Sequence, residues 1–283
     1  MPRDIDLAAL RGRHPEHFPR FGQQGRSTLL VGGAAVALLL FGMAELGFFS
    51  GKLVSGSVRL AEIVGLMLPP DPGDWAHARA YTLALLETIA IALTGTLSAA
   101  VLALPVALLA ARNVTASRIV RFLSRRSLDT LRSVDILVWA LIWINVVGLG
   151  PFAGVLALMT ADIGTFGKLF SEAMEAANRK PVDGIVSTGG NHLLGIRFGI
   201  LPEVFPVLAS QVLYYFESNT RSASIIGIVG AGGIGMYLAE AIRTLELQQT
   251  SFIILLILVT VAAIDFVSSR LRFAVIGRRG VVS

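Results

Sequence analysis

Long uninterrupted apolar segments constrain this chain more than any other feature. The segment 29–49 carries one charged residue, Glu45, and the segment 81–111 carries only Glu87. A third segment, 253–264, has no charged residue at all. About 20 apolar residues in a helix cross the hydrocarbon core of a bilayer, so the first two segments are long enough to span it. The sequence therefore predicts an all-α protein that crosses a membrane several times.

Composition agrees with a membrane protein, and a turn signal separates two of the spans. Hydrophobic residues make up 54% of the chain and charged residues 15%, whereas soluble domains contain about 25% charged residues. Gly148-Leu149-Gly150-Pro151 is typical of a turn, so two tight spans are expected around it. We expect six spans, at 28–50, 81–111, 134–149, 152–170, 203–229 and 251–270.

These spans divide the chain into four regions, and basic residues predict their orientation. The regions are a tail at 1–27, a first span with an external segment at 28–80, a transmembrane domain at 81–275 and a tail at 276–283. Of the 24 Lys and Arg residues, 19 lie on one side of the predicted membrane. Lys and Arg favour the cytoplasmic side, so both termini are expected to be cytoplasmic. Arg221 is the basic residue that falls well inside a predicted span, whereas Lys168 and Arg270 fall at the ends of theirs.

Two further segments are expected to lie against the membrane surface. Segment 56–68 mixes apolar residues with Arg59 and Glu62, which is typical of a short amphipathic helix. Segment 112–132 is a basic helix whose expected partner is lipid head groups. The basic segments contain few aromatic residues that could stack on bases, so the net charge of +5 does not indicate nucleic-acid binding.

No residue pattern indicates a bound cofactor. The chain has no cysteine, so a disulfide framework and a thiolate metal site are both excluded. His14 and His17 are the only histidines with metal-like spacing, and they lie in the N-terminal tail, where we expect no metal site. The phosphate-binding pattern G-x-x-x-x-G-K-[ST] is missing from the sequence, so the chain is not expected to hydrolyse ATP itself.

The connection between the fourth and fifth spans is expected to be structured. Pro181 and Pro202 lie at its two ends, and residues 189–191, Gly-Gly-Asn, form a turn signal between them. Proline has no backbone N–H, so it starts helices and breaks them. The pattern predicts two short helices joined by a turn. Such a hairpin at a membrane face suggests a docking surface for a partner protein.

Glu217 and Arg221 place opposite charges within the predicted fifth span. They are four residues apart, so they share a helix face and can pair. An unpaired charge in hydrocarbon costs about 3 kcal/mol, so the two side chains should face the bundle interior or a water-filled path. A purely structural ion pair meets the same requirement, and that alternative stays open. The guanidinium group of Arg221 would also suit transient contact with an oxyanion.

Residues 230–235 match the dinucleotide-binding pattern G-x-G-x-x-G letter for letter. They follow a strand-like segment, 224–229, and precede a helix-like segment, 236–245. In a soluble protein this arrangement would predict dinucleotide binding. The surrounding α/β repeats are absent here, and glycines in membrane proteins allow close helix contact and bends inside cavities. We therefore interpret the segment as a packing and gating element, with a membrane-bound oxidoreductase as an alternative.

From about residue 132 to 272 the sequence resembles the permease subunit of phosphonate ABC importers. The hairpin resembles their coupling loop, which has Glu-Ala-Ala, a glycine six residues after the Glu, and a later Leu-Pro. Asp183 stands in place of the Glu, and Gly184 and Ile185 in place of the alanines. The other matching segments are 132–134, 138–141, 147–151, 219–223 and 230–235.

Two details depart from this pattern or compete with it. Glu175-Ala176-Ala177 has the literal letters of the coupling motif, but neither the glycine nor the Leu-Pro follows it at the required distance. Asp135 stands where the family usually has proline. The first 130 residues match the family only in layout.

The resemblance implies a type I ABC importer permease in the bacterial inner membrane. It implies a homodimer, two ATP-binding ABC subunits, an external solute-binding protein and a phosphonate-like oxyanion as the transported solute. The implied ATPase-coupling residues are Asp183, Gly184, Gly189, Gly190, Leu201 and Pro202. The residues expected in the translocation path or gate are Glu217, Asn219, Arg221, Gly230, Gly232, Gly233 and Gly235. A permease for another solute class, such as amino acids, and an ion-coupled secondary transporter remain alternatives.

Overall fold

The computed structural model describes residues 24–48 and 51–276. The chain divides into two units, Met1–Gly65 and Leu66–Ser283, which we describe separately. Most of the two predicted tails, 1–27 and 276–283, lies outside the described residues, as do His14 and His17.

The described part of the first unit contains one membrane-length helix and a second, shorter helix. Helix α2 covers Gln24–Glu45, and its segment Thr28–Glu45 is apolar enough to cross a bilayer, as the sequence predicts. Helix α3 covers Lys52–Leu66 and ends before the two prolines at 69 and 70. It contains most of the predicted amphipathic segment 56–68, whose position on the membrane surface stays a prediction.

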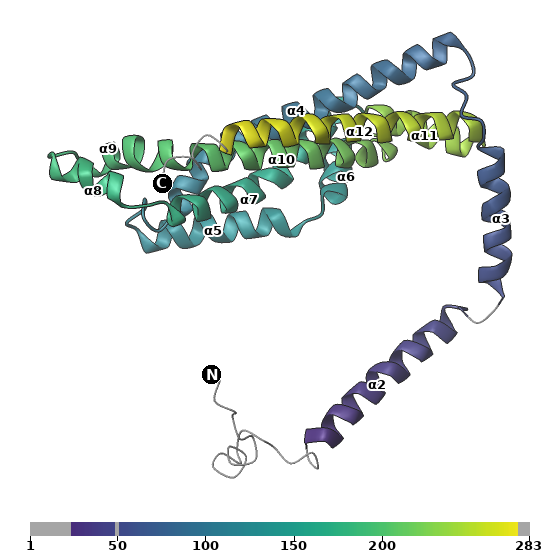
Figure 1. Cartoon of the computed structure of the whole chain (residues 1–283), viewed down its shortest axis with the longest axis horizontal. Helices are drawn as coiled ribbons and strands as arrows, with labels where there is room; N and C mark the ends of the chain where they lie inside the picture. Colours follow the sequence, from purple (N-terminus) through teal and green to yellow (C-terminus); the bar gives the residue numbers. More distant parts are fainter. Residues whose placement is uncertain (1–23, 49–50, 277–283) are drawn as a thin grey trace, which may run out of the picture. The chain divides into compact units, whose positions relative to one another are not determined.

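The second unit is a bundle built around four long helices. Helices α4, α7, α10 and α12 run along a common direction, and α4 packs extensively against α7 (Figure 1). Throughout residues 24–48 and 51–276 the regular elements are helical, without a β-strand. The elements are α4 (Trp75–Ala110), α5 (Arg118–Ser133), α6 (Ile136–Val147), α7 (Pro151–Ala176), α8 (Lys180–Ser187), α9 (His192–Leu194), the π-helical η2 (Gly195–Ile200), α10 (Leu201–Ile228), α11 (Ile234–Arg243) and α12 (Leu247–Ile276).

Small residues bring α4 and α7 into close contact. Ala99, Ala103 and Ala107 are completely buried on one face of α4 and belong to the same core cluster as Phe166 and Phe170 of α7. Residues four apart lie on one helix face, so this alanine row leaves space for the two aromatic rings. Small residues at helix contacts let backbones approach closely inside a membrane, where packing rather than water exclusion favours association.

The predicted third span, 134–149, is only partly correct. Within residues 24–48 and 51–276, five helical segments are long and apolar enough to cross a membrane, and the pair α5 and α6 provides a sixth only if it is counted as one broken span. Helix α6 has 12 residues, or about 18 Å at 1.5 Å per residue, which is too short to cross alone. An 88° bend separates it from α5. Asp135 starts α6 by accepting a hydrogen bond from Leu137 N at 2.8 Å, where the family usually has proline.

One local expectation is wrong. Pro202 does not end the helix, because residues 192–228 form one helical segment of 37 residues. A wide π turn precedes the proline, in which Leu201 N–H bonds to the carbonyl of Ile196, five residues earlier. The strand-like segment 224–229 is helical, as the predicted span 203–229 implies, since α10 continues to Ile228. Inside a bundle of spans, its β-branched residues pack as a helix.

Candidate functional site

The predicted hairpin consists of α8, a tight turn and α9. Gly189 has a φ of +87°, which favours glycine because a side chain is strained there. Gly190 N bonds to Ile185 O at 2.9 Å and Gly189 N to Val186 O at 3.0 Å. This pair of bonds is the Schellman arrangement that closes a helix C-terminus. The turn predicted from Gly189 and Gly190 is therefore present.

The hairpin is packed internally and leaves its tip exposed. A Cβ atom on Gly199 would lie 2.9 Å from Val182, so glycine at this position lets η2 pack closely against α8. Asp183 and Gly184 are exposed on α8, and a Cβ atom on Gly184 would meet nothing within 4 Å. The hairpin and η2 also expose large apolar side chains that the sequence analysis did not single out, namely Val186, Leu193, Leu194 and Phe198.

Polar contacts connect the hairpin to the bundle. The ring Nε2 of His192 lies 3.0 Å from the carbonyl of Val114, in the connection between α4 and α5. Asn178 N, just before α8, donates to Glu203 Oε1 in α10 at 2.9 Å. A displacement of the hairpin would therefore act on the connection between α4 and α5 and on the start of α10.

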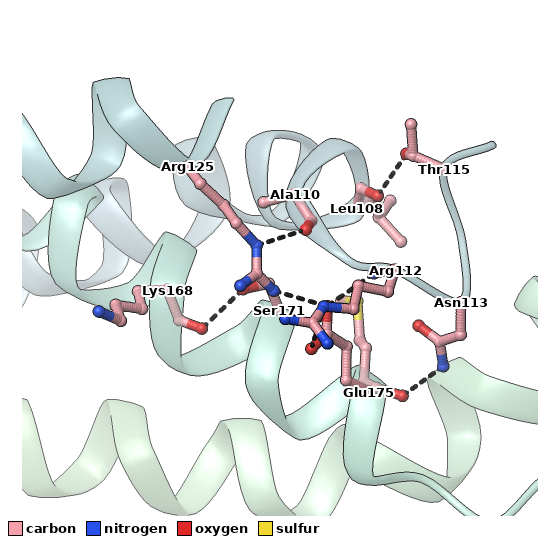
Figure 2. Close-up of polar contacts among 10 residues, drawn as sticks. Leu108, Ala110, Arg112, Asn113, Thr115, Arg125, Lys168, Ser171 and Glu175 are labelled. Atoms are coloured by element: carbon pink, nitrogen blue, oxygen red, sulfur yellow. Dashed lines mark hydrogen bonds and ion pairs between the residues drawn. The ribbon is translucent and has the colours of Figure 1, made fainter. Parts of the chain in front are cut away.

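Glu175 is a junction between three elements, not a part of the hairpin. Figure 2 shows its carboxylate beside Arg112 and Arg125. Its Oε1 accepts from Arg112 N at 2.7 Å and from Arg125 Nη2 at 2.6 Å. Arg125 Nε also donates to the carbonyl of Ala110 at 3.1 Å. Glu175 thus holds the ends of α4 and α7 against α5. This role agrees with the sequence analysis, in which the spacing excluded Glu175-Ala176-Ala177 as the coupling motif.

Glu217 has two arginine partners instead of the single one predicted. Its Oε1 lies 3.6 Å from Arg221 Nη2, as the i,i+4 spacing predicts. Its Oε2 lies 3.1 Å from Nη1 of Arg272, a residue of α12 that the sequence analysis placed outside the spans. Helix α12 continues beyond the predicted end at 270 to Ile276, so Arg221 is not the only basic residue in a long membrane helix. The Arg221 side chain is 51% exposed, whereas that of Glu217 is 8% exposed.

Asn219 does not share the exposed face of Arg221. It is buried, and its amide nitrogen donates to Thr96 Oγ1 at 2.8 Å and to a carboxylate oxygen of Asp162. This cluster joins α4, α7 and α10 inside one chain. A buried carboxylate in a membrane bundle needs such partners because its desolvation is costly. The contacts of Asn219 within the chain are therefore those of a residue that holds helices together.

The glycine segment forms a turn between α10 and α11, at the end of α10 opposite to the hairpin (Figure 1). Gly230, Gly232 and Gly233 have φ values of +106°, +85° and +74°. A Cβ atom on Gly235 would lie 2.1 Å from the carbonyl of Ser224, so α11 is in backbone contact with α10. The positive φ angles and the close packing of α11 on α10 thus explain why glycines occupy the positions of the G-x-G-x-x-G pattern.

Side chains of α4 hold this turn in place. Glu87 Oε1 accepts a hydrogen bond from Gly233 N at 3.0 Å, and Thr88 Oγ1 accepts one from Ile234 N at 2.8 Å. Gly150 N, in the turn before α7, donates to the carbonyl of Gly230 at 3.0 Å. The sequence analysis did not assign Glu87 this role, since its partner is a backbone group 146 residues away.

Comparison with known proteins agrees with this arrangement. The family described as "Binding-protein-dependent transport system inner membrane component" matches residues 103–279. The putative phosphite transport system permease protein HtxC of Stutzerimonas stutzeri is 39% identical over 225 residues, which cover 80% of this chain and 79% of the relative. The phosphite transport system permease protein PtxC of the same organism is 33% identical over 278 residues, covering 96% and 98%.

A third relative and a solved structure extend the comparison. The phosphate-import permease protein PhnE of Mycolicibacterium smegmatis is 34% identical over 253 residues, covering 89% of this chain and 46% of the relative. An inward-facing structure of the MetNI methionine ABC transporter matches with a TM-score of 0.61 at 19% identity, covering 71% of this chain and 99% of the other. At that identity the likeness establishes the type I ABC importer permease fold alone. The chain belongs to the family of binding-protein-dependent transport system inner membrane components and is a multi-pass transport permease of the inner membrane.

Proposed function

We propose that this chain is the membrane subunit of an ATP-driven importer for a phosphorus oxyanion, such as phosphite, phosphonate or phosphate. The observation that carries the proposal is the similarity to a phosphite permease along 96% of the chain. The proposed solute is anionic, so its path through the bilayer needs a compensating positive charge.

Arg221 is the side chain that best meets this need. Its guanidinium is half exposed on a long membrane helix, while the nearby Glu217 carboxylate is closer to Arg272. Two arginines against one glutamate leave a net positive charge in this cluster. A guanidinium group has the planar donor geometry that suits a phosphate-like oxyanion. A single partly screened arginine would bind it weakly, which permits release.

The hairpin is proposed to bind the ATP-hydrolysing subunits, because this chain has no nucleotide-binding pattern. Its exposed apolar residues Val186, Leu193 and Phe198 and the exposed Asp183 offer a mixed surface for a partner groove. Gly189, Gly190, Leu201 and Pro202 would set the shape of the hairpin and its junction with α10. Movement of the docked hairpin would reach α4 and α5 through the His192 contact.

The glycine segment is proposed as a gate at the opposite end of the path. Gly230, Gly232, Gly233 and Gly235 permit a tight turn that Glu87 and Thr88 hold against α4. Release of these few hydrogen bonds would let the turn move without unfolding a helix. The gate would face the external binding protein, while the hairpin, the basic segment 112–132 and both termini would face the cytoplasm.

The complete importer is proposed to contain two copies of this chain, two ATPase subunits and one external solute-binding protein. Two copies would place two Arg221 side chains around a shared central path. No cofactor is required for this activity, since the ATPase subunits supply the energy.

Uptake by the reconstituted importer tests the proposal. Proteoliposomes that contain this chain and its ATPase subunits, with the binding protein added outside, should accumulate labelled phosphite, methylphosphonate or phosphate only when ATP is enclosed. Methionine serves as the negative control. Uptake of amino acids but not of phosphorus oxyanions would overturn the solute assignment. Uptake that needs no ATPase and is abolished by an ionophore would instead establish an ion-coupled transporter.

A further inference from the structure

An open pocket beside α5 is lined mainly by arginines. Its volume is about 610 Å³, and it lies away from Arg221 and the glycine segment. Asp129 is the one acidic residue among those that line it. The lining residues are Arg112, Arg118, Arg121, Phe122, Arg125, Arg126 and Asp129.

Part of this positive charge has no acidic partner among the described residues. Arg112 Nε lies 3.9 Å from Glu175 Oε2 and Arg125 Nη2 lies 2.6 Å from Glu175 Oε1, so both guanidinium groups already pair with Glu175 at the junction between α4, α5 and α7 (Figure 2). Arg126 Nη1 lies 3.8 Å from Asp129 Oδ2, so Arg126 has an acidic partner. Arg118 and Arg121 form no ion pair within the described part of the chain. These two arginines are available to an outside anion.

The pocket lies where membrane-spanning helices end. Arg125 Nε donates to the carbonyl of Ala110, the last residue of α4. The partner of Arg125, Glu175, is the penultimate residue of α7. Helix ends of this kind mark the boundary between hydrocarbon and water. An anion held in the pocket would therefore lie at the depth of lipid head groups.

The same helix also exposes apolar side chains. Ile119 is 73% exposed, and Phe122 and Leu123 are each 59% exposed. On a helix these residues form a stripe next to the one that carries Arg118 and Arg121. A helix with a basic stripe and a neighbouring apolar stripe is suited to the bilayer interface. A soluble anion would make use of the arginines only, whereas a lipid would contact both stripes.

We propose that this pocket binds the phosphate group of an anionic phospholipid, with Arg118 and Arg121 as the donors. The acyl chains lie against Ile119, Phe122 and Leu123. Free inorganic phosphate presents the same oxygens, but it gains nothing from the apolar stripe. Binding at this site is independent of which solute the permease carries. The bound lipid would fix α5 at the membrane boundary, next to the junction that Glu175 forms.

Binding of fluorescent phosphatidylglycerol to the purified full-length chain tests the proposal. The variant Arg118→Gln/Arg121→Gln leaves Glu175 and its two partners unchanged. Each arginine near an anionic surface contributes about 1 kcal/mol, or roughly a fivefold change in affinity, so the double variant should bind roughly 25-fold more weakly. The matched control, Arg79→Gln/Arg243→Gln, removes the same charge on α4 and α11 and should bind as the parent does. Thermal unfolding of both variants checks that they fold.

Four results would overturn the proposal. One is unchanged lipid binding by the Arg118→Gln/Arg121→Gln variant. Another is an equal loss of lipid affinity in the control variant Arg79→Gln/Arg243→Gln. A third is equally tight binding of phosphatidylcholine, which would mean that the lipid charge is not recognised. The last is displacement of the fluorescent lipid by inorganic phosphate at a concentration equal to that of the lipid, which would show that the pocket binds free phosphate.

Discussion

Arg272 in α12 reaches across to Glu217 in α10, with 3.1 Å between Nη1 and Oε2, and is closer to that carboxylate than Arg221 is. The two arginines belong to different helices, so the carboxylate is shared between an interhelical contact and a contact within α10. Arg272 also lies over the ring of Tyr214, 5.8 Å from its centroid. The shared carboxylate makes the behaviour of Arg221 depend on the position of α12.

Replacing Arg272 with Gln should destabilise the bundle and impair transport. Glu217 is buried, and a buried charge left without any partner costs about 3–5 kcal/mol, which is an upper bound here because the longer contact to Arg221 remains. The remaining charge would also draw Arg221 toward Glu217, away from the path. We expect a lower unfolding temperature and at least a tenfold loss of uptake. The double variant Glu217→Gln/Arg272→Gln removes both charges, so it should recover most of the stability. Equal destabilisation of single and double variants would show that the pair is unimportant.

Replacing Arg221 with Gln should affect transport and leave folding intact. The closer pair between Glu217 and Arg272 remains in this variant, so the unfolding temperature should change little. Loss of a charged hydrogen bond to the solute costs about 1.5–3 kcal/mol, or roughly 10- to 150-fold in the rate at low solute concentration. Arg221→Lys keeps the charge and should retain part of the activity. The variant Glu217→Gln/Arg221→Gln is a poorer test, because it leaves Arg272 without its carboxylate. Normal uptake by Arg221→Gln would assign Arg221 a structural role.

A bulky residue at Gly189 should separate ATP hydrolysis from transport. The space around Gly189 is open within the chain, but its φ of +87° strains any other residue by about 1 kcal/mol. Gly189→Trp should therefore insert into the membrane normally and fail to dock. The measurement is uptake together with ATPase activity in the assembled importer. Gly189→Ala is the matched control, because it introduces the same backbone strain at this φ without the bulk of the indole ring. Assembly and uptake at parental levels in Gly189→Trp would refute docking through this turn.

The hairpin was more predictable from sequence than the charged cluster, for physical reasons. A left-handed turn needs glycine, so Gly189 and Gly190 identify it locally. The junction of Pro202 with α10 was mispredicted, because the π turn at Gly195–Ile200 accommodates the missing N–H without a break. Hydropathy ended the last span at 270, although nothing in the sequence stops the helix there.

Long-range partners were not predictable from sequence. The contact between Glu217 and Arg272 joins residues 55 positions apart, and that between Glu87 and Gly233 joins residues 146 positions apart. Neither pair follows from a local spacing rule. The short α6 was taken as a full span because its composition is apolar, although α5 and α6 meet at an 88° bend. Periodicity thus identifies elements, while contacts between elements depend on the folded bundle.

Removing the Glu87 carboxylate should loosen the glycine turn. Gly233 N–H donates to Glu87 Oε1, so Glu87→Ala leaves a partly buried donor without an acceptor, at a cost of about 1–3 kcal/mol. If the turn is a gate, the variant should leak the solute through the membrane without ATP. The measurement is passive efflux of labelled phosphite from loaded proteoliposomes.

Glu87→Gln is the control for this experiment, because its amide oxygen can still accept the hydrogen bond from Gly233. Proteoliposomes that contain the Glu87→Gln variant should leak no more labelled phosphite than those with the parent chain. Gly235→Ala gives an independent check on the packing, since its Cβ atom would lie 2.1 Å from the carbonyl of Ser224 and should prevent correct folding. If Glu87→Ala unfolds at a lower temperature but does not leak, the turn contributes to packing only, and the gate must lie elsewhere along the path.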